Sequence, residues 1–93
     1  MPTLESISRD QLASRIAEAS LLRGEFTLRS GRKSSYYLDK YLFSTQPDIL
    51  HALGLMFAER IAALPGDSVT KLAGAELGGI PLVCAASVSS GIP

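Results

Sequence analysis

Residues 73–81 read AGAELGGIP, and this stretch decides how the rest of the chain is interpreted. It follows a short apolar run and opens a segment of small residues typical of a helix. Its three glycines let the backbone turn tightly and let a ligand approach the backbone N–H groups. The first turn of a helix also offers unpaired N–H donors and a partial positive charge. The stretch therefore predicts a strand-to-helix turn, which is either purely structural or a site for phosphate.

Taken alone, the glycine pattern favours the purely structural turn, because short glycine signals are often coincidental. It matches neither the G-x-G-x-x-G dinucleotide fingerprint nor the G-K-S/T ending of a Walker A loop. Glu76 adds a negative charge to the turn. A carboxylate beside a phosphate requires a metal ion, a sugar hydroxyl or a basic group between them.

The composition is that of an ordinary globular chain of one small domain. Among the 93 residues, nine Lys and Arg balance nine Asp and Glu, so no bulk charge indicates nucleic acid or an anionic membrane. No apolar run approaches the roughly 18 residues that span a bilayer, and we expect no signal peptide. A cytoplasmic location fits the single cysteine, Cys84, which we expect to be a buried small hydrophobe. His51 is expected to be an exposed helix residue and not a metal ligand.

Three helices are predicted, over residues 8–22, 47–64 and 80–90. Residues 8–11 read SRDQ, which has the form of a capping box, and Arg23-Gly24 is the expected stop of the first helix. Thr45 is the expected cap of the second helix, with residues 41–46 as a connection. Gly54 within that helix is expected to permit close packing, and Gly91 to end the third helix. The second helix has an apolar stripe that we expect to face the core: Leu50, Leu53, Gly54, Phe57, Ile61 and Leu64.

Between the first two helices the apolar period changes to two, which predicts a β-hairpin over residues 25–39. Five basic residues against two acidic ones lie between positions 23 and 40, beside Tyr36 and Tyr37. The charge is compatible with a solvated hairpin tip. It is equally compatible with a site for a planar acidic ligand, because arginine binds carboxylate or phosphate with two hydrogen bonds and tyrosine stacks on rings.

Residues 69–73 are short and apolar and predict a strand that enters a sheet. One such strand cannot cover the apolar surfaces of its flanking helices. The sequence therefore predicts an incomplete α/β domain, with an N-terminal helix and hairpin over residues 1–46 and the start of an α/β core over residues 47–93. Either it is the N-terminal portion of a larger domain, or it borrows strands from a partner.

Two segments resemble orotate phosphoribosyltransferases. Residues 23–39, RGEFTLRSGRKSSYYLD, are similar to the hood segment of these enzymes, and residues 74–81 resemble their pyrophosphate-binding loop. The order of helix, hairpin, helix, strand and loop also fits. The resemblance covers nearly the whole chain and implies the N-terminal portion of a type I phosphoribosyltransferase fold.

The resemblance implies the transfer of phosphoribosyl from 5-phosphoribosyl 1-pyrophosphate to orotate, with Mg²⁺, in pyrimidine synthesis. It implies small-molecule substrates, Mg²⁺ carried mainly by the phosphoribosyl pyrophosphate, and a homodimer in the complete protein. It assigns ligand contacts but no catalytic or metal-ligating side chain to this chain. The implied substrate-binding residues are Arg29, Tyr36, Tyr37, Leu38, Glu76, Leu77, Gly78 and Gly79.

The chain departs from the family pattern in both segments. Leu38 stands where some members have an aromatic residue against orotate, and Leu77-Gly78 replaces a Tyr-Lys pair, so that backbone N–H groups remain as the donors of the loop. The resemblance also implies a non-proline cis peptide between Glu76 and Leu77. The ribose-5-phosphate loop and the mobile basic loop are not among these residues, so we expect the chain alone to be inactive. Two other hypotheses are a purine-type phosphoribosyltransferase and a non-enzymatic module that binds anions or a protein partner.

Overall fold

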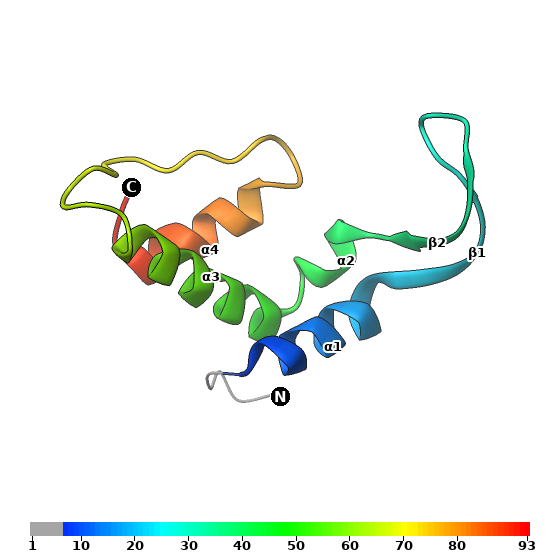
Figure 1. Ribbon diagram of the computed structural model, residues 1–93, viewed down its shortest axis with the longest axis horizontal. Coiled ribbons are helices and arrows are strands. Elements are labelled where there is room, and N and C mark those ends of the chain that lie inside the picture. The colour runs from blue at the N-terminus through cyan, green and yellow to red at the C-terminus, as the bar shows by residue number, and fades with distance from the viewer. Residues whose placement is uncertain (1–6) are drawn as a thin grey trace.

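The computed structural model describes residues 7–93, which form four helices and one hairpin (Figure 1). The order is α1 (Arg9–Ser20), β1 (Leu21–Thr27), β2 (Lys33–Leu38), α2 (Lys40–Phe43), α3 (Pro47–Ala62) and α4 (Ile80–Ser90). The hairpin projects from one end of the helices, and the long connection from α3 to α4 runs along the other (Figure 1). The described helices fall short of the length and apolar character needed to cross a membrane.

Helix α1 begins at the predicted capping box. The Gln11 backbone N–H donates to Ser8 Oγ at 3.1 Å, and the Ser8 N–H donates to Gln11 Oε1 at 2.9 Å. The helix ends at Ser20, earlier than the predicted Arg23-Gly24 stop, because Leu21 and Leu22 already pair with Leu38 and Tyr37 in the hairpin. Leu21 and Leu22, which the local helix signals assigned to the first helix, therefore belong to β1.

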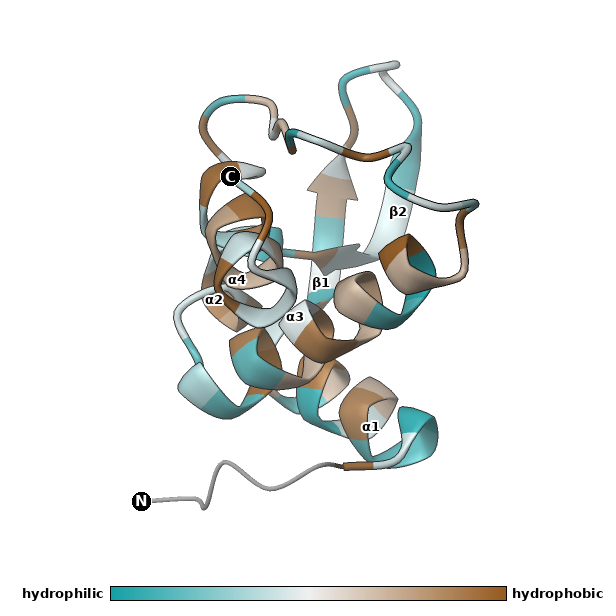
Figure 2. Cartoon of the chain, turned by 90° about the vertical axis from the view of Figure 1, so that its left-hand side faces the viewer, coloured by the Kyte–Doolittle hydropathy of each residue, from teal (hydrophilic) through white to brown (hydrophobic). Residues whose placement is uncertain are grey.

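The hairpin is antiparallel and longer than the predicted alternation. Its register shifts between Arg23 and Phe26, where Gly24 has a φ of 154°. The tip is closed by hydrogen bonds from Gly31 N–H to Leu28 C=O and from Leu28 N–H to Arg32 C=O, both 2.8 Å. Figure 2 shows hydrophobic segments on the helices and on β1, whereas β2 is pale over most of its length.

The predicted connection over residues 41–46 contains the short helix α2. Asp39 caps it by accepting a hydrogen bond on Oδ1 from the Tyr41 N–H at 3.0 Å. Thr45 is not the cap of α3, because its hydroxyl donates to the Leu42 carbonyl at 2.8 Å and Gln46 occupies the cap position. The predicted connection and the predicted Thr45 cap were both wrong, because Asp39 caps α2 and the Thr45 hydroxyl is hydrogen-bonded to the end of α2.

The core lies between α1 and α3 and is built on Leu12, Ile49 and Ala52. Ile49 is completely buried. The predicted stripe on α3 was only partly correct, since Gly54 is buried but Phe57 and Leu64 are 42% and 49% exposed. Leu64 lies beyond the end of α3, which stops at Ala62 instead of the predicted residue 64, and Phe57 lines a cavity beside residues 72–74. In addition, one face of α3 meets α1 and another meets α4. A single stripe cannot describe a helix with two packing faces.

Gly54 permits the close packing of α3 on α4, as predicted. A methyl group at this position would lie 2.6 Å from Ser89 Oγ and 2.7 Å from the Ala85 carbonyl oxygen of α4. Helix α4 matches its predicted bounds and ends at Gly91, which has a φ of 77° and donates to the Ser87 carbonyl at 2.8 Å. Cys84 on α4 is exposed, and His51 on α3 is half-buried, so both exposure predictions were wrong.

The predicted strand over residues 69–73 is absent from the described part of the chain. One backbone hydrogen bond joins this segment to the C-terminal residues, from Leu72 N–H to the Pro93 carbonyl at 2.8 Å. A strand needs a ladder of such bonds with a neighbour. The apolar pattern identified a segment suited to a sheet, but residues 7–93 supply no strand beside it.

A bidentate ion pair ties α1 to the start of α3. Arg15 Nε lies 2.7 Å from Asp48 Oδ2, and Arg15 Nη2 lies 3.0 Å from Asp48 Oδ1. The Asp48 side chain is only 10% exposed. The hydrogen bonds from the guanidinium hold the pKa of the Asp48 carboxyl below its usual range, despite the opposing effect of burial.

We predict that Gly54→Ala destabilises the fold. In an exposed helix this change would add about 1 kcal/mol of stability through helix propensity. Here the added methyl overlaps α4, and overpacking costs about 1–3 kcal/mol. Chemical denaturation measures the free energy of unfolding, and Ser14→Ala on the exposed face of α1 is the control. A Gly54→Ala variant more stable than the unmodified chain would contradict the close contact.

We predict that the Arg15–Asp48 pair stabilises the fold at neutral pH and that this stabilisation is lost in acid. Because the folded-state pKa of Asp48 is lowered, its contribution is present above the ordinary carboxyl pKa of about 3.9 and is lost as the pH falls through the folded value. Thermal melts of the unmodified chain and of Asp48→Asn should therefore differ at neutral pH and converge in acid. A constant difference across this range would show that the pair does not cause it.

Candidate anion-binding site

The glycine turn before α4 forms a compact loop over residues 74–79. The peptide bond between Glu76 and Leu77 is cis, which confirms that prediction. Gly79 N–H donates to the Ala75 carbonyl at 2.8 Å, and Ile80 N–H donates to the Leu77 carbonyl at 3.2 Å. The loop is thus closed on itself immediately before the helix begins.

Close backbone approach makes two of the loop glycines necessary. A methyl on Gly74 would lie 2.5 Å from the Gly79 carbonyl oxygen and 2.9 Å from Val83 Cβ. A methyl on Gly79 would lie 2.7 Å from the Ala75 carbonyl oxygen. Each is closer than nonbonded atoms approach in proteins, so side chains at these positions would open the loop.

The loop contains backbone donors without a hydrogen-bond partner. Within residues 7–93 the N–H groups of Ala75, Glu76, Leu77 and Gly78 make no hydrogen bond to the protein. Successive unpaired N–H groups at the start of a helix are well suited to an anion. Leu77 is 69% exposed and Glu76 is also exposed, whereas Gly78 is buried.

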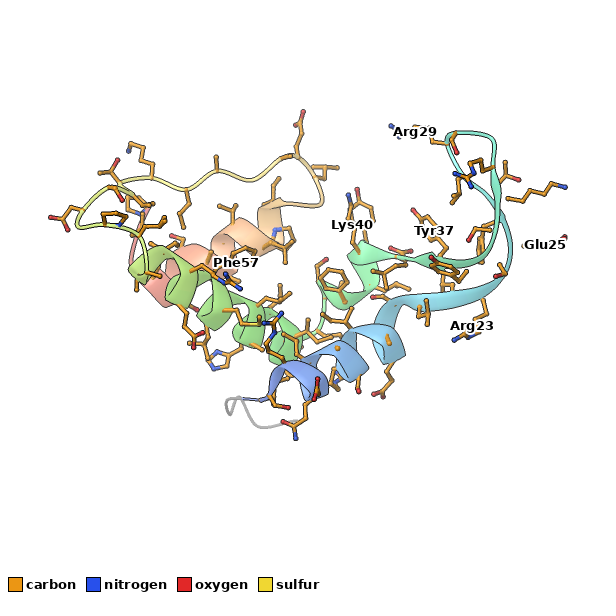
Figure 3. The ribbon with its side chains drawn as sticks, viewed as in Figure 1. Arg23, Glu25, Arg29, Tyr37, Lys40 and Phe57 are labelled. Carbon is orange, nitrogen blue, oxygen red and sulfur yellow. The ribbon has the colours of Figure 1, made fainter. Side chains whose placement is uncertain are left out.

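The hairpin residues singled out in the sequence are also accessible. Arg29 is exposed at the tip, and Tyr36, Tyr37 and Leu38 on β2 are 57%, 47% and 49% exposed. Tyr37 packs on Phe26 with ring centroids 5.8 Å apart, which orients its ring. Figure 3 shows Arg29 and Tyr37 on the side of the ribbon that faces the glycine loop, whereas Arg23 points to the opposite side.

The structure adds Lys40, which the sequence reasoning counted only as part of a basic stretch. Its side chain extends from the start of α2 towards the loop (Figure 3). A methyl on Gly78 would lie 2.7 Å from Lys40 Cε and 3.2 Å from its Nζ. The hairpin end of the molecule and the glycine loop therefore meet at this contact. Nothing in the sequence indicated this contact, because Lys40 and Gly78 are 38 positions apart.

The cavity beside the loop is apolar, and the described residues form no metal-binding cluster. A cavity of about 310 Å³ lies between α3, α4 and the segment before the loop, and it is lined mainly by aliphatic side chains, with Phe57 at one wall. No group of three His, Cys, Asp or Glu side chains gathers within residues 7–93 in a way that could hold a metal ion. The polar chemistry of this region therefore rests on the loop N–H groups and the basic side chains.

Comparison with solved structures defines the class. The chain superposes on the orotate phosphoribosyltransferase of Mycobacterium tuberculosis H37Rv in complex with inorganic phosphate, with a TM-score of 0.75 and 27% identity over 91% of this chain and 49% of that one. It also matches the UMP synthase of Leishmania donovani, with a TM-score of 0.75 and 25% identity over 89% of this chain and 18% of the other. The fold is that of the N-terminal portion of a type I phosphoribosyltransferase.

Sequence comparison narrows the class. The chain is 53% identical over 70 residues to the orotate phosphoribosyltransferase of Methanocella arvoryzae, covering 75% of this chain and 38% of that protein. It is 45% identical over 85 residues to the enzyme of Halobacterium salinarum, covering 90% of this chain and 46% of the relative. No protein-family model matches the chain. The homologues are orotate phosphoribosyltransferases, and the chain spans less than half the length of these curated relatives.

We predict that Gly74→Ala deforms the loop. The added methyl cannot fit between Gly79 and Val83, so the backbone N–H signals of residues 75–79 should shift in a two-dimensional ¹H–¹⁵N NMR spectrum and the melting temperature should fall. The neighbouring exposed residue offers a control, Ala73→Ser, whose changes should stay local. Unshifted signals at Gly79 and Val83 in Gly74→Ala would show that the loop is not packed as described.

Proposed function

We propose that this chain supplies the orotate-binding and pyrophosphate-binding elements of an orotate phosphoribosyltransferase. The reaction transfers phosphoribosyl from 5-phosphoribosyl 1-pyrophosphate to orotate and yields orotidine 5′-monophosphate and pyrophosphate. The observation that carries the proposal is a glycine loop with four N–H groups that have no partner among residues 7–93, on the side of the ribbon towards which Arg29 and Tyr37 point. Relatives of that name and the phosphate complex of the M. tuberculosis enzyme support it.

The chemistry suits these groups. Displacement at the ribose C1 passes through a state with positive charge on the sugar while negative charge grows on the leaving diphosphate. Preorganised N–H groups at residues 75–78 would stabilise that diphosphate without having to reorganise during the reaction. Electrostatics and positioning supply most of such catalysis, and little proton transfer is needed.

The hairpin would bind the other substrate. Arg29 presents a planar guanidinium that can hold a carboxylate or phosphate with two hydrogen bonds. Tyr37 offers an exposed ring face and a hydroxyl group to the planar ring of orotate. Tyr36 and Leu38 alternate with Tyr37 along β2, and Tyr36 pairs with Arg23, so these two side chains lie on the other face of the strand. The loop residues Glu76 to Gly79 would meet the diphosphate.

Mg²⁺, a homodimer and a cytoplasmic location form part of the proposal. Since the described residues gather no metal-binding cluster, Mg²⁺ would arrive with the phosphoribosyl pyrophosphate and neutralise its oxygens. Glu76 is the acidic residue of the loop, and the metal or a ribose hydroxyl would separate its carboxylate from the phosphates.

We further propose that these 93 residues alone do not turn over substrate. The acidic, Thr/Gly-rich ribose-5-phosphate turn and the mobile basic loop that the family resemblance implies do not occur among them. Formation of orotidine 5′-monophosphate by the purified chain should therefore lie far below the rate of a complete enzyme. A comparable rate would contradict this part of the proposal.

The test of function is ligand binding by isothermal titration calorimetry. We predict that the chain binds 5-phosphoribosyl 1-pyrophosphate with Mg²⁺, and binds orotate in preference to hypoxanthine. Arg29→Ala should weaken orotate binding roughly 10-fold or more, because a charge-assisted hydrogen bond contributes about 1.5–3 kcal/mol. Arg9→Ala on α1 removes the same charge away from the hairpin and should have little effect. Preference for hypoxanthine would favour a purine-type enzyme, and binding of neither base would favour an interaction module.

A further inference from the structure

Lys40 is held in place by the backbone around it. The Asp39 N–H donates to the Ser20 carbonyl at 3.0 Å, which ties the start of α2 to the end of α1. The Asp39 carboxylate in turn accepts the Tyr41 N–H at 3.0 Å. Lys40 lies between these two anchored residues, so its Cα position is fixed relative to α1 and the hairpin.

The end of the Lys40 side chain occupies the space that a side chain at position 78 would fill. A methyl built on Gly78 would lie 2.7 Å from Cε, 3.2 Å from Nζ and 3.3 Å from Cδ of Lys40. Gly78 is buried, although its neighbours Leu77 and Glu76 are exposed. The lysine therefore covers this glycine, and a side chain at position 78 would displace the flexible end of Lys40.

The Lys40 ammonium group is not neutralised by the described chain. Within residues 7–93 no carboxylate oxygen lies within salt-bridge distance of Nζ, which lies over the Tyr41 ring, 5.8 Å from its centroid. The ammonium lies beside the loop whose N–H groups at residues 75–78 are unpaired. A positive side chain thus lies beside a loop whose backbone donors have no partner among residues 7–93.

We propose that Lys40 is the cationic ligand of the pyrophosphate loop, which substitutes from α2 for a lysine that the loop itself lacks at position 78. The inference rests on the proposed function and adds a substrate-binding residue to it. The ammonium would contact the diphosphate of 5-phosphoribosyl 1-pyrophosphate from its position over Gly78. Lys40 follows Leu38 by two residues, so one short segment serves both the orotate side and the diphosphate side.

The test separates the charge of Lys40 from its packing. Lys40→Met keeps an unbranched aliphatic stem over Gly78 but removes the ammonium. Titration with pyrophosphate and Mg²⁺, followed by calorimetry, should show binding weakened roughly 10-fold or more with an unchanged melting temperature. Lys71→Ala, at an exposed position before the loop, removes the same charge and should change the affinity less than twofold.

A swap of positions provides the second measurement. Gly78→Lys alone should weaken binding, because its side chain and that of Lys40 compete for one space. Combining it with Lys40→Ala frees that space and should restore most of the lost affinity. A double variant that binds pyrophosphate no better than Gly78→Lys alone would contradict the inference.

Two results would overturn the inference, and they differ in what they say of the proposed function. If Lys40→Met binds pyrophosphate as tightly as the unmodified chain, Lys40 is a packing residue and the proposed function stands. If the unmodified chain binds neither pyrophosphate nor 5-phosphoribosyl 1-pyrophosphate, the pyrophosphate loop and its lysine fail together.

Discussion

The packing of α3 against two different partners is the interaction on which the rest of the structure depends. On one side Ile49 and Ala52 meet Leu12 of α1, and the Arg15–Asp48 ion pair closes the edge of that contact. On another side Gly54 brings α4 close enough for its backbone to touch α3. Helix α1 carries the hairpin and α2, whereas α4 carries the glycine loop. Helix α3 therefore sets the distance between the two halves of the candidate site.

This arrangement explains how a small chain can position two substrate-binding elements without a complete sheet. The hairpin has little buried surface of its own, and its tyrosines remain about half exposed. The loop is held by its own backbone hydrogen bonds and by Gly74 and Gly79. Neither element needs the other to hold its local shape. Helix α3 is needed to fix the distance between the hairpin and the loop. The two elements meet at the contact between Lys40 and Gly78.

Local signals in the sequence predicted local structure well. The capping box at Ser8, the bounds of α4 with Gly91 at its end, and the hairpin all follow from interactions between residues close in the chain. The cis peptide in the loop came from family resemblance, since no spacing argument indicates it. Ligand roles for Arg29 and the loop residues stay predictions, because geometry shows access and donors and not a bound molecule.

The errors arose where distant parts of the chain decide the outcome. Helix α1 ends early because Leu21 and Leu22 pair with β2, and residues 69–73 remain without a strand because a ladder needs a neighbour. Cys84 was placed inside because its sequence neighbours are apolar, yet its side of α4 has no cover among the described residues. In each case the outcome depends on the residue's neighbours in the folded structure, and hydrophobic periodicity gives no information about those neighbours.

Position 78 shows why the same limit applies to function. In sequence terms a glycine there removes a positive charge from the loop, and the backbone N–H groups are left to bind the diphosphate. In three dimensions the glycine makes room for the ammonium of Lys40, which is supplied by another helix. The distinction depends on whether a side chain from elsewhere occupies the space that the missing one would fill. A charge that is lost from a motif can therefore be retained by a site, and only the packing around the motif distinguishes the two cases.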